Sequence, residues 1–295
     1  MATPAHVPEP DVPGIGDGPV LRRRELGQAS ARSLLLTVLG EFVRPAGEPV
    51  WTRALLEVLG SLDVEPKSAR QALARTAAEG LLRSDRDGRR VRWSLTAAGD
   101  RLLSEGAERI YGFGAPAKAW DGRWLVLLAS VPESRRQLRH RLRTRLAWAG
   151  LGSPAPGVWV SPDPGKEPEV AAVLDELDLG GMSSSFVGRY GAIGRAGDVV
   201  AQAWDLNRVE QAYSEFLDEF GPDAAGDAEP AGGVLARQVQ LVHAWRRFPF
   251  LDPELPAELL PEQWAGTRAA QLFATLHARW DPAARARWAE LAAQG

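Results

Sequence analysis

Cysteine is absent from this sequence, which excludes disulfide bonds, cysteine nucleophiles and thiolate metal sites. Histidine is scarce: His6, His140, His243 and His277 are the four present, and no two are close together in the sequence, so we expect no metal site and no cofactor. No run of about 18 apolar residues occurs, so no membrane-spanning helix is predicted. The proline- and glycine-rich start does not have the basic and then apolar order of a secretory signal, which favours a cytoplasmic location.

The overall composition is typical of a globular protein, but the charge is unevenly distributed. Hydrophobic residues make up 45% of the 295 residues and charged residues 25%, which is enough to form a core. At about 100–200 residues per domain, this length predicts two or three domains. Residues 1–150 carry 24 Lys and Arg against 17 Asp and Glu, whereas residues 151–295 carry 11 against 21. The basic first half indicates that one end of the protein meets a polyanion, unless the imbalance is compositional chance.

Helical periodicity begins at Ser30, which is a suitable N-cap residue. Three helices are expected up to Gly80, and the third starts at Pro66, a residue favoured in the first helical turn. The next segment predicts an arginine-rich β-hairpin that turns at Asp87-Gly88, followed by another helix. Three helices followed by such a hairpin are typical of a winged helix-turn-helix, here over residues 29–110.

The third helix has two distinct faces on a helical wheel. Small and apolar residues such as Ala69, Ala72 and Leu73 form one face, which suits packing on neighbouring helices. The other face combines three cations with a hydroxyl and an amide, a mixture that suits phosphates and base edges in a DNA major groove. The residues expected to contact DNA are Lys67, Ser68, Arg70, Gln71 and Arg75 on this helix, with Arg86, Arg89 and Arg90 on the hairpin. The alternative is a protein-interaction surface whose arginines are merely solvated.

In the middle of the chain, short apolar strands alternate with helices. This alternation predicts a small ferredoxin-like α/β module over residues 120–200. The expected elements are a linker Tyr111–Ala119, a strand Trp124–Ala129, a helix Glu133–Ala149, a turn Pro154–Gly157, a strand Val158–Val160, a helix Glu167–Leu177 and a strand Ser185–Tyr190. Six arginines on the first of these helices could bind DNA, an acidic ligand or an acidic partner, or could border a subunit contact.

The last part of the chain is expected to be helical and rich in aromatic residues. Its expected elements are a helix Leu206–Phe220, a loop Gly221–Gly233, a helix Val234–Arg247, a bend Phe248–Pro256, a helix Pro261–Trp280 and a final helix Arg285–Leu291. No enzyme motif is evident there, so we expect it to serve packing and oligomerisation. The whole chain is thus predicted to be a multidomain α+β protein, with a flexible tail over 1–28, a winged helix over 29–110, a central module over 120–200 and a helical domain over 201–295.

Several segments resemble the PaaX family of transcriptional repressors. They are Ala31–Gly40, Val64–Leu82, Trp120–Leu127, Trp245–Pro256 and Leu272–His277, and Trp245–Pro256 is the most specific. The resemblance implies a homodimeric repressor of aromatic-acid catabolism genes that binds a double-stranded DNA operator and is released by phenylacetyl-coenzyme A. It also implies a central module with the fold of the small CRISPR-associated endoribonucleases. The first strand here ends Ala129-Ser-Val-Pro132, without the acidic residue that those nucleases carry.

An acyl-coenzyme A effector needs cations for its phosphates and aromatic walls for its adenine and acyl groups. The candidate effector residues are Arg189, Tyr190, Arg195, Trp204, His243, Arg246 and Arg247, although each of them could instead be an ordinary core or helix residue. Two rival classes stay open, namely an enzyme that uses coenzyme A thioesters and a structural dimer that binds no DNA. The segment Gly181–Ser185 lacks the glycine spacing of a nucleophile elbow, so we expect no catalytic residue and no enzyme.

Overall fold

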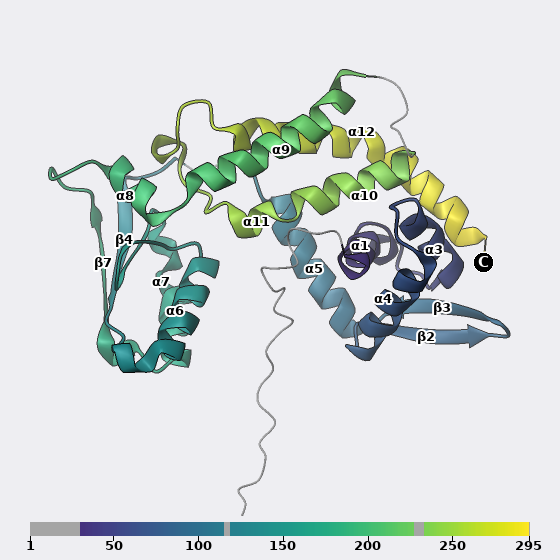
Figure 1. The fold of residues 1–295 in the computed structure, drawn as a ribbon, viewed down its shortest axis with the longest axis horizontal. Helices are drawn as coiled ribbons and strands as arrows, with labels where there is room; N and C mark the ends of the chain where they lie inside the picture. The colour runs from purple at the N-terminus through teal and green to yellow at the C-terminus, as the bar shows by residue number, and fades with distance from the viewer. Residues whose placement is uncertain (1–29, 115–118, 227–232, 295) are drawn as a thin grey trace, which may run out of the picture.

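The computed structural model describes residues 30–114, 119–226 and 233–294. The predicted tail over residues 1–28 lies outside the described residues. The molecule is elongated, with a four-stranded sheet towards one end and a β-hairpin at the other, and long helices run between them (Figure 1). Each helix in these ranges falls short of the length or the hydrophobicity that a bilayer-spanning segment needs.

The N-terminal unit contains the three predicted helices and the hairpin. Ser30 caps the first helix, because its hydroxyl accepts a hydrogen bond of 3.1 Å from the backbone amide of Ser33. The elements are α1 Ala31–Val38, the π-helical turn η1 Leu39–Val43, α2 Arg44–Ala46, β1 Val50–Trp51, α3 Thr52–Gly60, α4 Pro66–Ala78, β2 Leu82–Asp87, β3 Arg90–Leu95 and α5 Ala97–Gly112. The three strands form an antiparallel sheet in the order β1-β3-β2.

The hairpin turn lies one residue later than predicted. Asp87 pairs with Arg90, so the two turn residues are Gly88 and Arg89 rather than Asp87 and Gly88. Gly88 has a φ of 61°, and a glycine takes this conformation at the first turn position without a steric penalty. The strand β1 is absent from the prediction, because two residues are too short to show an alternating pattern.

The central module is a four-stranded sheet with helices on both faces. Its elements are β4 Arg123–Ala129, η2 Glu133–Arg135, α6 Arg136–Trp148, β5 Gly152–Ala155, β6 Val158–Ser161, η3 Pro164–Lys166, α7 Glu167–Glu176, η4 Gly180–Met182, β7 Ser183–Arg189 and α8 Ala196–Ala203. The strand order is β5-β6-β4-β7, and each neighbouring pair is antiparallel. The predicted turn at Pro154–Gly157 is partly wrong, since its first two residues belong to β5, where an edge strand tolerates a proline.

Strand β4 is buried on one face and partly buried on the other, although its apolar run predicts burial on both. Leu125 and Leu127 pack with Leu142 of α6 on one face. On the other face, Trp124 packs with Val200 of α8. The sheet is therefore covered by α6 and α7 on one side and in part by α8 on the other.

The C-terminal part consists of long helices around an aromatic core. Its elements are α9 Leu206–Ala225, α10 Val234–Trp245, α11 Phe248–Leu251, η5 Ala257–Leu259 and α12 Ala265–Ala293. Trp245 is 1% exposed and stacks on Phe273 at a ring-centroid distance of 4.7 Å. Tyr213 stacks on Phe248 at 4.2 Å, so aromatic side chains from four helices hold this core together.

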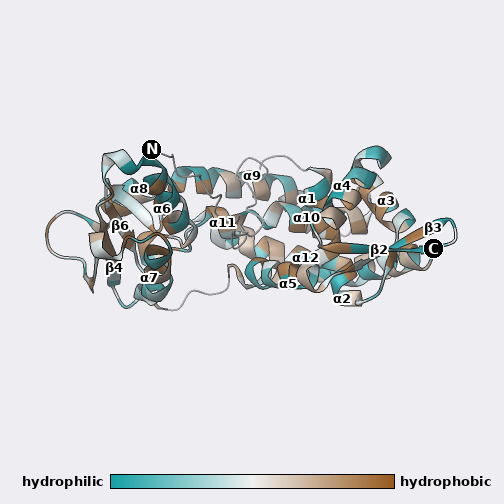
Figure 2. Cartoon of the chain, turned by 90° about the horizontal axis from the view of Figure 1, so that it is seen from below, coloured by the Kyte–Doolittle hydropathy of each residue, from teal (hydrophilic) through white to brown (hydrophobic). Residues whose placement is uncertain are grey.

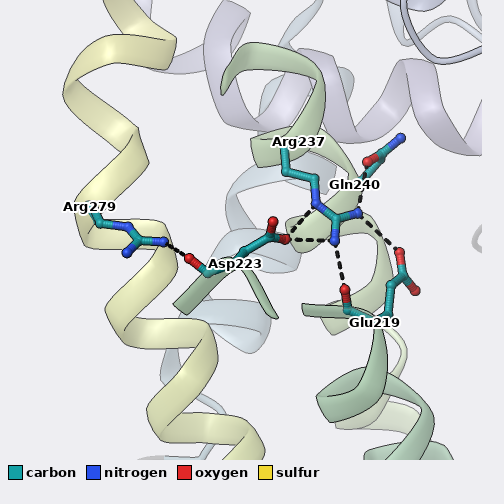
Figure 3. A network of polar contacts seen from close by, with 5 residues as sticks. All are labelled: Glu219, Asp223, Arg237, Gln240 and Arg279. Carbon is teal, nitrogen blue, oxygen red and sulfur yellow. Dashed lines mark hydrogen bonds and ion pairs between the residues drawn. The ribbon is translucent and has the colours of Figure 1, made fainter. Parts of the chain in front are cut away.

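Two predicted helix ends are wrong, because both α9 and α12 continue through a proline. In α9, Pro222 has no backbone N–H to donate within the helix, but arginines from neighbouring helices bond to the carbonyl groups of this last turn. Arg237 donates to the Glu219 carbonyl at 2.8 Å and Arg279 donates to the Asp223 carbonyl, as Figure 3 shows. In α12, Pro282 lies between two buried anchors, Trp280 and Ala284, so tertiary packing outweighs the lost hydrogen bond.

The end of α12 and the start of α10 complete the core of the N-terminal unit, and Figure 2 shows both helices beside α1 and α3. Leu235 and Val239 of α10 lie in the same buried cluster as α1 and α3. Trp288 of α12 stacks on Phe42 at 5.6 Å. The segments expected as separate domains over 29–110 and 201–295 therefore contribute to one core.

Candidate nucleic-acid interface

Helix α4 presents the polar face that its sequence predicts. Ala69, Ala72, Leu73 and Thr76 are buried and pack against α1 and α3. The five residues expected to contact DNA are all exposed on the opposite side; they are Lys67, Ser68, Arg70, Gln71 and Arg75. Within the described residues, the side chains of these five form no hydrogen bond or ion pair, so they are available to a ligand.

The hairpin beside α4 carries the second set of cations. Arg86, Arg89 and Arg90 are exposed, as expected for groups that reach a duplex. The guanidinium groups of Arg90 and Arg92 lie over the ring of Trp51, 5.4 Å and 5.5 Å from its centroid. This cation–π contact orients Arg90 and Arg92. The unpredicted strand β1 supplies Trp51, so the sequence reasoning missed a residue that positions the hairpin.

Acidic side chains near this surface are partly neutralised. Glu79, just after α4, pairs with Arg32 at 2.5 Å. Asp85 of β2 pairs with Arg92 at 3.1 Å. These ion pairs leave the exposed surface of α4 and the hairpin positive, and Figure 1 shows the hairpin projecting beyond the helices next to α4.

The seven candidate effector residues lie in two different surroundings. Arg189, Tyr190 and Arg195 are exposed around the end of β7, and Trp204 packs over Gly152 of β5. The remaining three, His243, Arg246 and Arg247, lie at the end of α10 and just after it. The contacts of the two groups lie in different parts of the described structure, so the effector residues stay a prediction divided between two places.

His243 and Arg246 connect α10 to α1. His243 Nδ1 lies 3.1 Å from Thr37 Oγ1, and Arg246 donates to the Ser33 carbonyl at 3.0 Å. Burial, with a smaller contribution from the nearby Arg246 charge, lowers the pKa of His243 to about 4. His243 is therefore neutral at pH 7, and both side chains already have structural partners.

A buried carboxylate that the sequence reasoning missed lies on η1, where this segment meets α5, α10 and α12. Glu41 is 4% exposed and accepts hydrogen bonds from Gln238 Nε2 at 3.0 Å and from Tyr111 Oη, while His277 Nε2 lies 2.8 Å from it. Burial favours the neutral acid, but the hydrogen bonds from His277, Tyr111 and Gln238 outweigh it and hold the pKa of Glu41 below its usual range. The signal was available, since Glu41 stands at a core-facing position of an otherwise apolar helical stripe.

The segment after α5 also departs from the prediction of a linker. Tyr111 lies in α5, and its ring stacks with Phe273 at 6.3 Å. Phe113 packs on Trp245 at 5.6 Å. A hollow of about 360 Å³ lies between these side chains and His277. The rest of the predicted linker, residues 115–118, lies outside the described residues.

The fold defines the general class of this protein. It is a three-part α+β chain whose N-terminal unit presents a basic helix and hairpin. Three models of one family match the parts in order. These are the PaaX-like protein over residues 30–99, the PaaX protein central Cas2-like domain over residues 117–200 and the PaaX-like protein C-terminal domain over residues 204–290. The chain belongs to the PaaX family.

Two individual proteins illustrate the similarity. The transcriptional repressor PaaX of Escherichia coli strain K12 is 32% identical over 266 residues, which cover 87% of this chain and 82% of that protein. A solved structure, the uncharacterized protein Rv0674 from Mycobacterium tuberculosis, is similar with a TM-score of 0.58 at 25% identity. That match covers 87% of this chain and 99% of the solved one.

Proposed function

We propose that this protein is a sequence-specific DNA-binding transcription regulator, a repressor of aromatic-acid catabolism genes. The observation that carries the proposal is the exposed polar face of α4 beside the arginine-rich hairpin. The N-terminal unit then acts as a winged helix-turn-helix, in which α4 enters the major groove and the hairpin is the wing. The name of the 32% identical relative, a transcriptional repressor, supports the same function. The central module, with its β-α-β-β-α-β order, serves as a ferredoxin-like structural part.

Each exposed side chain has a role in this proposal. Arg70, Gln71 and Arg75 contact base edges or phosphates in the groove, since guanidinium and amide groups match the acceptors there. Lys67 and Ser68, at the start of α4, contact the DNA backbone. The hairpin residues contact phosphates or the minor groove; they are Arg86, Arg89 and Arg90.

A titration of operator DNA tests this assignment. The probe is duplex DNA from upstream of the protein's own gene, and the readout is fluorescence anisotropy at several salt concentrations. Replacing Arg70 and Arg75 together by Ala removes two contacts worth about 1–3 kcal/mol each, so binding should weaken at least roughly 30-fold, with a shallower salt dependence. Arg208→Ala, which removes an exposed charge from α9, is the matched control and should bind as the native chain does. Equal affinity of the double variant and the native chain at every salt concentration refutes the role of α4.

We also propose that the regulator is a homodimer formed through the central module. Phe186 is 58% exposed and Leu128 is 43% exposed, and the pairing of Val126 with Phe186 puts both on the same face of the sheet. Strand β7 is an edge strand, so its outer backbone groups are unpaired within the sheet. A second copy would cover both features. Phe186→Ser should then reduce the mass measured by light scattering from two chains to one, whereas Phe250→Ser, at a residue that is 45% exposed elsewhere, should not.

The proposed effector is an aryl-coenzyme A thioester such as phenylacetyl-coenzyme A. Arg189 and Arg195 are exposed and suit its phosphates. Calorimetry with phenylacetyl-coenzyme A should show binding that the joint replacement of these two arginines by Ala weakens and that Arg208→Ala leaves unchanged. The same thioester, followed for hydrolysis or acyl transfer, tests the alternative of a coenzyme A-using enzyme; we expect release of DNA without turnover. A chain that binds neither DNA nor thioester would instead be a structural dimer.

A further inference from the structure

Three side chains that can bind a metal ion meet where η1 of the N-terminal unit touches α12. Glu41 lies on η1, while His277 and Asp281 lie one turn apart on α12 and so share a face of that helix. One ligand atom from each of the three lies within 4.8 Å of the others. Glu41 is buried, and the other two are partly buried.

Two buried oxygen atoms at this place have no hydrogen-bond partner within the described residues. One is Asp281 Oδ1, whose companion oxygen Oδ2 accepts from Arg285 Nε at 2.8 Å. The other is Oε1 of Gln238, a residue that is 0% exposed and whose amide nitrogen donates to Glu41 Oε1. A buried acceptor without a donor is destabilising, so two of them beside a carboxylate indicate that a positive group belongs there.

We propose that Glu41, His277 and Asp281 bind one Zn²⁺ ion, and that the amide oxygen of Gln238 is the fourth ligand. Imidazole nitrogen and carboxylate oxygen are common zinc ligands, at about 2.0–2.2 Å from the metal. Rotation of the Gln238 amide by half a turn exchanges its nitrogen and oxygen, which have nearly the same shape. The oxygen then faces Glu41, an arrangement that two acceptors tolerate when a cation lies between them.

The metal replaces a proton between His277 and Glu41. His277 Nε2 lies 2.8 Å from Glu41 Oε1, an ordinary hydrogen-bond distance at which Nε2–H donates to the carboxylate. Zinc binds the lone pair of Nε2, so that nitrogen gives up its proton and the neutral ring carries its hydrogen on Nδ1 instead. No oxidation or reduction is involved.

Surrounding groups orient the ligands and give access to them. Tyr111 Oη donates to Glu41 Oε2, and Arg285 Nε holds Asp281 Oδ2, so each carboxylate is fixed by a neighbour. The positive charge of Arg285 offsets one of the two negative charges that the metal would meet. The hollow of about 360 Å³ is lined by His277 and Tyr111, so it lies beside the proposed site. The bound ion would tie the N-terminal unit to α12.

Calorimetric titration of the full chain with zinc tests the site. The protein carries no histidine tag and is first dialysed against a chelator, then titrated with ZnCl₂. We expect one ion per chain, with affinity lowered at least tenfold by His277→Ala and by Asp281→Ala. The control is His140→Ala, which removes an exposed histidine of α6 outside the cluster and should leave binding unchanged. MgCl₂ at the same concentration should give no binding heat, because Mg²⁺ prefers oxygen ligands alone.

Cobalt provides a readout of geometry. Co²⁺ added to the native chain should give the intense visible absorption of a four-coordinate site, and His277→Ala should lose it. Circular dichroism of each metal-free variant checks that it is folded. Absence of zinc binding by the native chain, which would leave water as the partner of the two oxygens, overturns the proposal. So does equal binding by the native chain and the two folded α12 variants.

Discussion

Replacing His243 by Gln should remove a specific sensitivity of this fold to acid. His243 lies on α10 against α1, with Nδ1 3.1 Å from Thr37 Oγ1. Arg246, one turn further along, also donates to Thr37 Oγ1 at 3.1 Å, so a second positive charge at His243 would face a fixed one. Burial and this charge lower the pKa of His243 from 6.5 to about 4. The folded protein therefore resists protonation that the unfolded chain accepts.

The sign and size of the effect follow from this shift. Between pH 6.5 and about 4, the unfolded chain binds more protons at His243 than the folded chain does. The contribution of neutral His243 to stability is therefore fully present above pH 6.5 and decreases as the pH falls through this window. At about 1.4 kcal/mol per pH unit, the loss from this one residue reaches about 3 kcal/mol. A glutamine side chain is polar but does not titrate, so the His243→Gln variant should lack this component.

Urea unfolding of the native chain and of His243→Gln, from about pH 7.5 to about pH 4.5, measures the difference. Across that range, the free energy of unfolding of the native chain should fall by roughly 2–3 kcal/mol more than that of the variant. His140→Gln is the matched control, because His140 is exposed on α6, and it should follow the native curve. A constant difference between the native chain and His243→Gln at all pH values would show that His243 titrates normally and that the argument is wrong.

Two further predictions concern stability, and urea unfolding measures both. Arg237→Met should destabilise the chain by about 2 kcal/mol, because the Asp223 carboxylate would lose its partner in the network of Figure 3. The side chains of Arg237 and Asp223 are only 16% and 22% exposed, so water would replace this partner poorly. A loss of stability below about 0.5 kcal/mol would contradict this prediction. Gly99→Ala should cost about 2–3 kcal/mol, because its Cβ would stand 2.1 Å from the Leu81 carbonyl oxygen. Gly106→Ala in the same helix has no neighbour within 4 Å and should instead add about 1 kcal/mol, so opposite signs are the expected result.

Local patterns were sufficient to predict the helix α4 and most strands of the central sheet. Pro66 and the alternation of small apolar with charged residues define α4 within the segment itself, so no distant contact is needed. The run in β4 likewise predicts a strand with neighbours on both sides. These are the features on which the candidate DNA surface depends.

What the sequence did not predict depends on residues far apart in the chain. The last turn of α9 is stabilised past Pro222 by Arg237 and Arg279, which no local rule for proline includes. Glu41 becomes the centre of a polar cluster only when α5, α10 and α12 arrive around it. Periodicity indicates that such a position is buried, but it does not identify the groups that compensate the charge.

The shared core has a consequence for how this protein is made. Trp288 and Leu291 pack among the first helices, yet they are translated long after those helices. The helix that carries Arg70 and Arg75 therefore cannot rest on a finished core during synthesis. A polypeptide truncated before Trp288 would lack these side chains, so its N-terminal helices would have an incomplete core.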